Sequence, residues 1–324
     1  MDSHVFIIGA GFNADAQKYI HTINQMVSYP LIGDLAKKCF GLDRIQEGTS
    51  IEALFQKAID DDKPDPLGKL CDAIMVADHY LTDFNENSIY QKFIRAFPDS
   101  NFISFNYDAF LEILLLKSKE WRPEDGFGLP VKANFFRDPS SFGIPRRSRR
   151  FVLHLHGSLY VYTQEFSSSP PDQGGIEWMK MLPEPIYLFD PDCVVSRFSP
   201  FERVPPNFGY VHVYDRIIAP VPNKASSNKN PFVKKSFEKA IELLSSARAV
   251  IAIGYSFNPA DEASYKILLS TLKKQKKALT IINPQAREIA GRLSDRFNIE
   301  CRPIQCSFFD WAQRSFNCAT PEFN

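Results

Sequence analysis

The chain lacks a Cys-x-x-Cys pair, a net charge and a long apolar run. A formal net charge of zero, from 38 basic and 38 acidic residues, argues against a general nucleic-acid-binding surface. With no membrane-length apolar run and no secretion-type leader, we expect a cytoplasmic protein that does not enter the membrane. Neither a zinc ribbon nor a disulfide framework is expected, and no bound metal, because the six cysteines are scattered: Cys39, Cys71, Cys193, Cys301, Cys306 and Cys318.

Hydrophobic residues are plentiful by contrast. They make up 44% of the 324 residues, which is enough for a substantial core. A chain of this length suits one large α/β domain with elaborations, or two small domains.

Four short apolar runs each stop abruptly at small or polar residues. Such runs predict strands that are buried on both faces of a parallel sheet. Ligands of open α/β sheets bind just beyond the C-terminal ends of the strands. We therefore expect the polar residues that end these runs to converge on one site. The four segments are Val5–Asn13, Phe102–Asp108, Phe151–Gly157 and Val250–Phe257.

Alternation of strands and helices predicts an α/β fold with a Rossmann-like parallel sheet core. Predicted strands span 5–8, 101–105, 151–155, 250–253 and 279–282, and predicted helices span 34–40, 50–59, 66–77, 109–119, 232–247, 260–276 and 284–297. We predict a single domain over 1–324, with a core of 1–32, 98–120, 151–160 and 232–310, a helical insertion at 33–97, and irregular insertions with small antiparallel strands at 121–150 and 161–231.

The turn Gly9-Ala10-Gly11 directly follows the first predicted strand. Glycines in such a turn let the backbone approach a pyrophosphate closely. The full dinucleotide fingerprint needs a third glycine, and Ala14 stands at that position. A tight turn without a ligand is therefore the alternative. Asn13 is either a ligand contact or a helix cap.

Asn106-Tyr107-Asp108 follows the second strand and precedes an apolar helix. Polar residues two positions apart can both face a pocket where a strand ends. The structural alternative is that Asn106 satisfies a turn while Asp108 caps the helix.

His154 and His156 occupy alternate positions, so on an ideal strand they share a face. His156 lies at the strand end beside Gly157, nearest the expected cleft, and is a candidate acid–base residue. A bond to a backbone carbonyl is its structural alternative. His154 lies deeper, and we expect it to be a hydrogen-bonded core histidine.

Small residues also end the fourth strand. Gly254-Tyr255-Ser256 can approach a phosphate or ribose, and Asn258-Pro-Ala-Asp261 then has the chemistry of a helix start, so Asp261 is expected to be structural. Asn283 ends the next strand, where a turn before a helix is the alternative to a ligand contact. The basic run Arg146–Arg150 is expected to be a solvated loop.

Together the four segments resemble the sirtuin superfamily, in particular its bacterial SIR2-like NAD-hydrolase branch. Leu155-His156-Gly157 matches the His-Gly of sirtuins, and Asn106-Tyr107-Asp108 resembles their Asn-containing segment. Gly-Tyr-Ser-Phe followed by an Asp, and a strand that ends in Asn-Pro, recur in the SIR2-like branch. The resemblance covers nearly the whole core, from Val5 to about Phe297.

By this resemblance, His156 is the catalytic base, Asn106 contacts the nicotinamide ribose or the attacking water, and Asp108 holds the nicotinamide end. Ser256 lines the cofactor site, and Asn283 contacts the adenosine ribose. In sirtuins a small residue, usually Ser, follows the glycine turn, where Phe12-Asn13 stands here. The remaining residues of the predicted cofactor-binding set are Gly9, Ala10, Gly11, Phe12, Asn13, Gly254 and Tyr255.

The resemblance implies an NAD+ glycohydrolase that acts in bacterial anti-phage defence by depleting NAD. NAD is then the substrate, and a homo-oligomer or a protein activator is the expected partner. Sirtuin deacylases usually carry a four-cysteine zinc module, which this chain lacks, so NAD hydrolysis is favoured. The alternatives are a non-catalytic NAD- or nucleotide-binding regulatory subunit, and a protein deacylase or ADP-ribosyltransferase.

Overall fold

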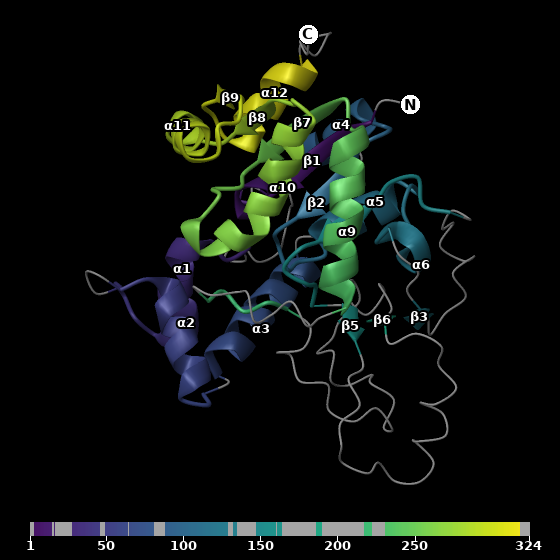
Figure 1. Ribbon diagram of the computed structural model, residues 1–324. Coiled ribbons are helices and arrows are strands. Elements are labelled where there is room, and N and C mark those ends of the chain that lie inside the picture. Colours follow the sequence, from purple (N-terminus) through teal and green to yellow (C-terminus); the bar gives the residue numbers. More distant parts are fainter. Residues whose placement is uncertain are drawn as a thin grey trace.

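The computed structural model describes residues 3–14, 16, 28–45, 49–63, 65–80, 88–128, 132–134, 147–159, 161–163, 186–189, 217–221 and 231–317. Six strands form the main sheet: β1 (His4–Ile8), β2 (Asn101–Ser104), β4 (Val152–His154), β7 (Ala249–Ile253), β8 (Leu279–Ile282) and β9 (Cys301–Ile304). All run parallel, in the spatial order β4-β2-β1-β7-β8-β9. Helices flank this sheet (Figure 1), so the predicted α/β, Rossmann-like class is confirmed.

The strand order reverses between β1 and β7. Strands β1, β2 and β4 lie in chain order from the centre of the sheet to one edge. The chain then returns to the centre, where β7 lies beside β1, and β8 and β9 continue to the other edge. This is the doubly wound arrangement in which a crevice opens beyond the C-terminal ends of the two central strands. A ligand site is therefore expected beyond Ile8 and Ile253, which pair across the two strands.

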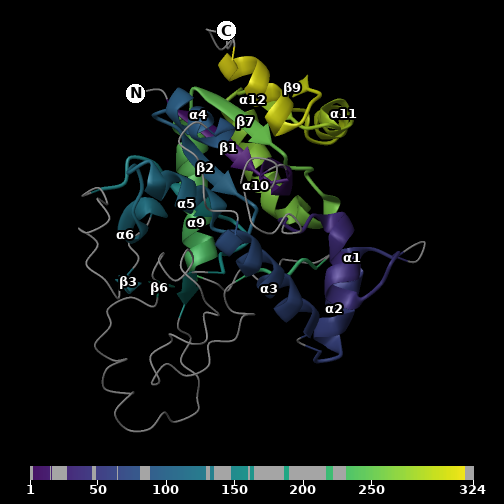
Figure 2. The same cartoon turned by 180° about the vertical axis from the view of Figure 1, so that it is seen from behind.

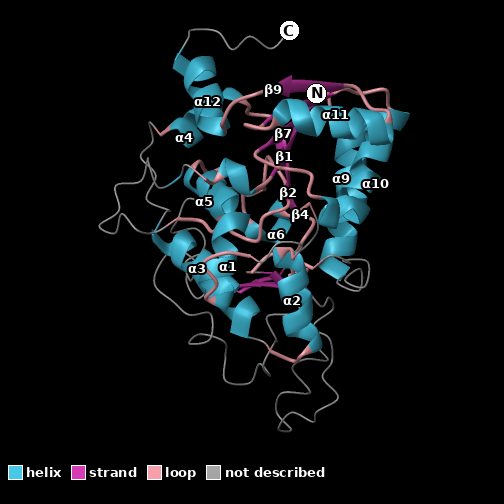
Figure 3. Cartoon of the chain, turned by 90° about the vertical axis from the view of Figure 1, so that its left-hand side faces the viewer, coloured by secondary structure: helices cyan, strands magenta, loops and turns pink. Residues whose placement is uncertain are grey.

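Two layers of helices enclose the sheet, as Figure 3 shows with the strands between them. One layer packs with the core cluster that contains Phe6 and Ile8. It comprises α4 (Ile89–Ala96), α5 (Phe110–Lys117) and α12 (Phe308–Asn317), and the same core cluster continues into α1 (Ile32–Phe40), α2 (Ile51–Asp60) and α3 (Asp65–Tyr80). The opposite cluster, with Val5 and Ile7, contains residues of α9 (Pro231–Ser246), α10 (Glu262–Lys274) and α11 (Ala286–Phe297).

Alternation along β1 explains why both faces are covered. Phe6 and Ile8 belong to one cluster and Val5 and Ile7 to the other, and all four are at most 1% exposed. Successive side chains of a strand point to opposite faces, so a continuous apolar run needs a helical layer on each side.

Helix α2 begins as the sequence predicts. The Ser50 hydroxyl accepts a hydrogen bond from the Ala53 amide at 3.1 Å, and so satisfies one of the unpaired donors of the first turn. Helix α2 lies beside α1 and α3 below the main sheet, as the two opposite views show (Figures 1 and 2).

The middle of the chain contributes a second, smaller sheet. Its strands are β3 (Lys132–Asn134), β5 (Val161–Thr163) and β6 (Ile186–Phe189). Strands β5 and β6 are antiparallel as predicted, but β3 and β6 run parallel. The expectation of antiparallel strands alone is therefore corrected. The remaining described helix of this region is the short α6 (Pro123–Gly126).

Strand β9 and helix α12 were not predicted. Strand β9 pairs only with β8 among the described strands, and it carries Arg302 and Pro303. An edge strand tolerates proline and charge, which removes the apolar signal on which strand prediction relies. No helix in the described part of the chain is long and apolar enough to cross a membrane.

Candidate functional site

A cavity of about 160 Å³ lies beyond the C-terminal ends of the central strands. Its walls include Ala10 and Asn13 after β1, Asn106 and Asp108 after β2, and His156 after β4. A cavity of roughly 150 Å³ is known to admit one benzene ring, so this space suits a single six-membered ring. The structure thus brings together five of the predicted site residues from three strand ends.

Asp108 combines a capping bond with a place in the cavity wall. Its Oδ1 accepts a hydrogen bond from the Phe110 amide at 3.1 Å, at the start of α5. Burial, and then the neighbouring Glu112 carboxylate, raise the pKa of Asp108 to about 6, although the Phe110 amide, the Asn13 side chain and the His154 ring lower it. The carboxyl group is therefore poised to change its charge near neutral pH.

The main chain of Asn106 is held on both sides. Its amide donates to the Ser104 hydroxyl at 3.1 Å, and its carbonyl lies 2.9 Å from His154 Nδ1. A carbonyl oxygen can only accept, so His154 Nδ1 carries a proton. These bonds fix the backbone from which the Asn106 side chain joins the cavity wall.

His154 has no exposed surface and uses both ring nitrogens. Its Nε2 lies 2.5 Å from Oε1 of Glu112, on α5. Burial lowers the pKa of His154, but the Glu112 carboxylate, together with the Asn106 carbonyl and Asp108, outweighs burial and raises that pKa overall. The expectation of a hydrogen-bonded core histidine agrees with these contacts, and its purely structural role stays a prediction.

His156 has different partners because β4 ends at His154 and the chain turns there. Its Nε2 lies 3.6 Å from Oδ1 of Asp261, and its ring meets the Phe105 ring edge-on at 5.0 Å. The side chain is 3% exposed and belongs to the cavity wall. His156 is thus the histidine that faces the cavity.

Asp261 belongs to the site, although the sequence suggested a structural role at the start of a helix. Asn258 caps this turn, since its Oδ1 accepts from the Ala260 amide at 3.0 Å. The side chain of Asp261 makes no capping bond to α10 and instead faces His156 and the Tyr255 hydroxyl, which donates to Oδ2 at 3.3 Å. The sequence signal that could have placed Asp261 in the site is its position after Gly-Tyr-Ser-Phe. An acidic residue at that position is equally typical of a helix start.

Glu52 is a second residue that the sequence did not indicate. It projects from α2, in the predicted helical insertion, and its Oε1 accepts a hydrogen bond from Asn258 Nδ2 at 2.7 Å. Both residues line the cavity. The insertion therefore supplies part of the wall, which a local sequence pattern cannot reveal.

The glycines of the predicted phosphate turn pack against β7. The amides of Gly9 and Gly11 donate to the carbonyls of Ile253 and Gly254, at 3.1 and 2.9 Å. A Cβ on Gly9 would lie 2.5 Å from the Tyr255 Cα, and Gly254 has a φ of +62°. The glycines thus permit the turns after β1 and β7 to approach each other closely, which is the role expected of a tight turn without a ligand. These two amides are not directed at a ligand.

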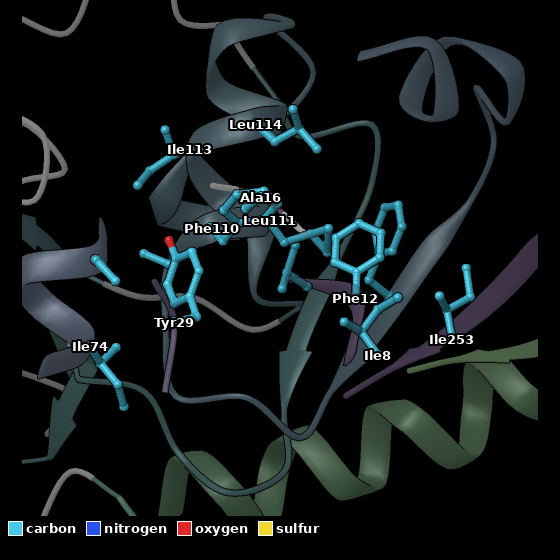
Figure 4. Packing of buried hydrophobic residues seen from close by; sticks show 14 of the residues in the cluster. Ile8, Phe12, Ala16, Tyr29, Ile74, Phe110, Leu111, Ile113, Leu114 and Ile253 are labelled. Carbon is cyan, nitrogen blue, oxygen red and sulfur yellow. The ribbon is translucent and has the colours of Figure 1, made fainter. Parts of the chain in front are cut away.

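The side chain of Phe12 lies in the core and not in the cavity wall, so the predicted cofactor contact of Phe12 is left to its backbone and stays a prediction. Its side chain has no exposed surface and packs in the core (Figure 4), where its ring lies 4.6 Å from that of Phe308. A side chain without accessible surface cannot touch a cofactor. The apolar character of Phe12 therefore serves packing.

The remaining predicted cofactor residues lie outside the cavity wall. Ser256 is exposed, and its carbonyl accepts a hydrogen bond from Arg292 at 2.7 Å. Asn283 Oδ1 accepts from the Gln285 amide at 2.9 Å, as its turn alternative predicts. Tyr255 is buried against Phe105, with ring centroids 4.1 Å apart. Their contacts with a cofactor stay predictions.

The basic run is not simply a solvated loop. Arg147 and Arg149 are exposed, but Arg150 has no exposed surface and pairs with Oε2 of Glu120 at 2.6 Å. It also donates to the Ile94 carbonyl at 2.8 Å. The expectation is therefore wrong at Arg150, which is a structural link, while Arg146 lies outside the described residues.

The cavity is acidic. Glu52, Asp108 and Asp261 contribute carboxyl groups, and its described wall holds no lysine or arginine. Such a wall favours a cationic ligand. Within the described residues, no group of three or more His, Cys, Asp or Glu side chains could hold a metal ion.

Fold and site define a Rossmann-like α/β protein with an acidic cavity the size of one six-membered ring. The cavity lies at the switch point, where the strand order reverses between β1 and β7. No protein-family model and no curated protein matches the chain. It is similar to a solved structure described as "The Structural basis of Sirtuin Substrate Affinity", with 12% identity, 96% of this chain and 92% of that chain covered, and a TM-score of 0.38. For "Structural Basis for the Mechanism and Regulation of Sir2 Enzymes" the values are 16%, 93%, 86% and 0.37. Likeness this low assigns neither a family nor an activity.

Proposed function

We propose that this protein is an NAD+ glycohydrolase that releases nicotinamide and ADP-ribose. The observation that carries the proposal is the acidic, ring-sized cavity that joins His156, Asn106 and Asp108. Nicotinamide in NAD+ is a six-membered cationic ring, and this wall complements both its size and its charge. The resemblance of the four sequence segments to SIR2-like NAD hydrolases supports the same reaction.

The reaction breaks the bond between ribose C1′ and the nicotinamide nitrogen. The electron pair of that bond goes to the nitrogen, so nicotinamide leaves neutral and needs no general acid. Water forms the new bond to C1′, and its proton passes to His156. This separates the site from glycosidases, which use one carboxyl group to protonate the leaving oxygen.

Each cavity residue has a proposed role. His156 is the general base, and Asn106 orients the water or the ribose from a backbone fixed at both its amide and its carbonyl. Asp108, once ionised, holds the nicotinamide end and stabilises positive charge that develops on the sugar. The Asn13 side chain beside Asp108 favours that ionised form.

The rest of the dinucleotide is proposed to lie across the switch point. Ala10 is exposed and lines the cavity, so the pyrophosphate is placed beside it rather than on the amides of Gly9 and Gly11. Exposed Ser256 then faces the adenosine half. By the resemblance, the biological role is an anti-phage effector that depletes cellular NAD, in the cytoplasm and under the control of a partner or of self-assembly.

The test is to incubate the purified chain with NAD+ and to quantify nicotinamide and ADP-ribose. We expect both products in equal amounts, and a loss of about a hundredfold or more in His156→Ala and Asn106→Ala. His4→Ala, a histidine at the opposite end of β1, is the matched control and keeps its turnover.

Two other outcomes of this assay would overturn the proposal. Binding of NAD+ without release of nicotinamide would make the chain a nucleotide-binding regulatory subunit. Release that depends on an acylated peptide or a protein acceptor would instead make it a deacylase or an ADP-ribosyltransferase.

A further inference from the structure

Asp261 and Tyr255 close a ring of contacts around His156. The His156 ring meets the Phe105 ring edge-on at 5.0 Å, and Phe105 stacks on Tyr255 at 4.1 Å and 14°. The Tyr255 hydroxyl donates to Oδ2 of Asp261 at 3.3 Å. Oδ1 of the same carboxylate lies 3.6 Å from His156 Nε2 and completes the ring.

We propose that Asp261 is a positioning residue that orients the His156 ring and stabilises the imidazolium formed during NAD+ cleavage. This inference rests on the proposed function. Asp261 comes from the 3₁₀ turn η6 (Pro259–Asp261) after β7, whereas His156 follows β4, so the pair spans the sheet from one half to the other.

The carboxylate is committed to this arrangement. Asp261 is 9% exposed, and its side chain does not cap α10, because Asn258 has taken the capping role. Burying a carboxylate costs free energy unless hydrogen bonds and a positive partner compensate. The Tyr255 hydroxyl provides the first, and His156, once it has accepted a proton, provides the second.

The chemistry follows from the separation of charges. When His156 takes the proton from the attacking water, its ring gains a positive charge beside a negative one. An opposite charge within this distance favours the charged form of the base. The other titratable groups around the ring are Tyr107, whose ring is 6.1 Å away, and two further carboxyl groups of the cavity wall, Asp108 and Glu52.

The test compares Asp261→Asn with Glu262→Gln in the full-length chain. Glu262 is the next residue, and it pairs with Arg296 outside the cavity wall, so its variant removes a neighbouring carboxylate without touching His156. The titration midpoint of the His156 ring is measured by NMR without NAD+, with the resonance assigned by His156→Gln. We expect the midpoint to fall by about one unit or more in Asp261→Asn and to stay unchanged in Glu262→Gln.

Turnover supplies the second measurement. Asp261→Asn is expected to lower kcat about tenfold or more, with a smaller change in KM, and to move the acid limb of the pH profile to lower pH. Asp261→Glu, which keeps the charge, should recover part of both effects. If Asp261→Asn does not fold, Asp261→Ser removes the charge with a smaller side chain and gives the same comparison.

An unchanged midpoint and pH profile in the folded variant would overturn the inference. Since the midpoint is measured without NAD+, it tests the pairing even if the wild-type chain releases no nicotinamide. If the wild-type chain releases no nicotinamide, that result overturns the proposed function and leaves the pairing of Asp261 with His156 standing.

Discussion

His154 and His156 show how far two nearby residues can differ in environment. His154 bonds the Asn106 carbonyl and Glu112, whereas His156 faces Asp261 and lines the cavity. The reason is the end of β4, after which the chain no longer alternates as a strand does. Shared spacing on an ideal strand therefore does not imply a shared role.

Replacing His154 is expected to cost stability first. His154→Ala leaves Glu112 and the Asn106 carbonyl buried without their partner, which should lower the free energy of unfolding by roughly 3–5 kcal/mol. Because the folded-state pKa of His154 is raised, its stabilising contribution is complete below the pKa of the unfolded chain and is lost as pH rises through the folded value.

Urea unfolding of His154→Ala, Glu112→Gln and the double variant at several pH values measures this coupling. The folded His154→Ala protein should still cleave NAD+, with a smaller loss of turnover than His156→Ala shows, because only one of the two bonds that fix the Asn106 backbone is removed. A fully stable variant without activity would reverse the roles assigned to the two histidines.

Asp108 should make stability depend on pH in the opposite way from a salt-bridged acid. Its pKa is raised from 3.8 to about 6, so the folded state binds the proton more tightly than the unfolded chain does. The contribution of Asp108 to stability is therefore largest below about pH 4 and falls as pH rises toward about 6, by an amount on the order of 3 kcal/mol.

Asp108→Asn keeps the shape and an acceptor for the Phe110 amide but removes the charge. We expect it to be more stable than the wild type at pH 7, with a difference that shrinks toward pH 4, and to lose NAD+ cleavage. Equal stability of the two proteins at both pH values would contradict the raised pKa.

At the scale of elements, the two halves of the sheet meet through glycine. Gly254 has a φ of +62°, and a Cβ there would clash with the Phe12 amide nitrogen. Gly9 and Gly11 make a similarly close approach from the β1 side. The turn after β1 can therefore lie this close to the turn after β7 only because these three positions carry no side chain.

Gly254→Ala should destabilise the fold strongly. Strain at a positive φ alone costs about 1–3 kcal/mol, and the clash adds to it. Gly291→Ala is the matched control, because Gly291 lies in α11 with open space around its Cα, and alanine there should stabilise by about 0.5–1 kcal/mol. Thermal melts compare the two, and a neutral Gly254→Ala would refute the packing role.

At the scale of the whole molecule, the helical insertion reaches the site. Glu52 of α2 bonds Asn258, and both residues line the cavity, so α2 is linked directly to the candidate site. An intracellular NAD+ hydrolase that was always active would exhaust the NAD of its host. We therefore expect activity to depend on self-assembly or on a protein partner, with the insertions at 33–97, 121–150 and 161–231 as contact surfaces.

The measurement is NAD+ turnover against protein concentration, alongside sedimentation velocity, with and without the proteins encoded beside this one. Specific activity should rise with assembly or with an added partner. Full activity of a lone monomer at every concentration would refute the gating hypothesis.

Much of the fold was predictable because buried parallel strands leave a direct trace in the sequence. All five predicted strands agree with observed strands within one residue at each end, and the strand predicted at 151–155 is shorter by one residue at both ends, at Val152–His154. Predicted helix boundaries differ more, since the segment predicted at 260–276 begins with a 3₁₀ turn and continues as α10. Edge strand β9 was not predicted, because an edge strand can form without the apolar run that marks a buried strand.

The sequence by itself determined the parallel core and the polar strand ends, since continuous apolar runs require burial on both faces and the ends of parallel strands share one edge. Only the tertiary structure decided which side chains meet there. Asp261 lies beside His156, Glu52 accepts a hydrogen bond from Asn258, and Phe12 packs in the core. These outcomes depend on how elements distant in the chain pack together, and local spacing carries no record of that packing.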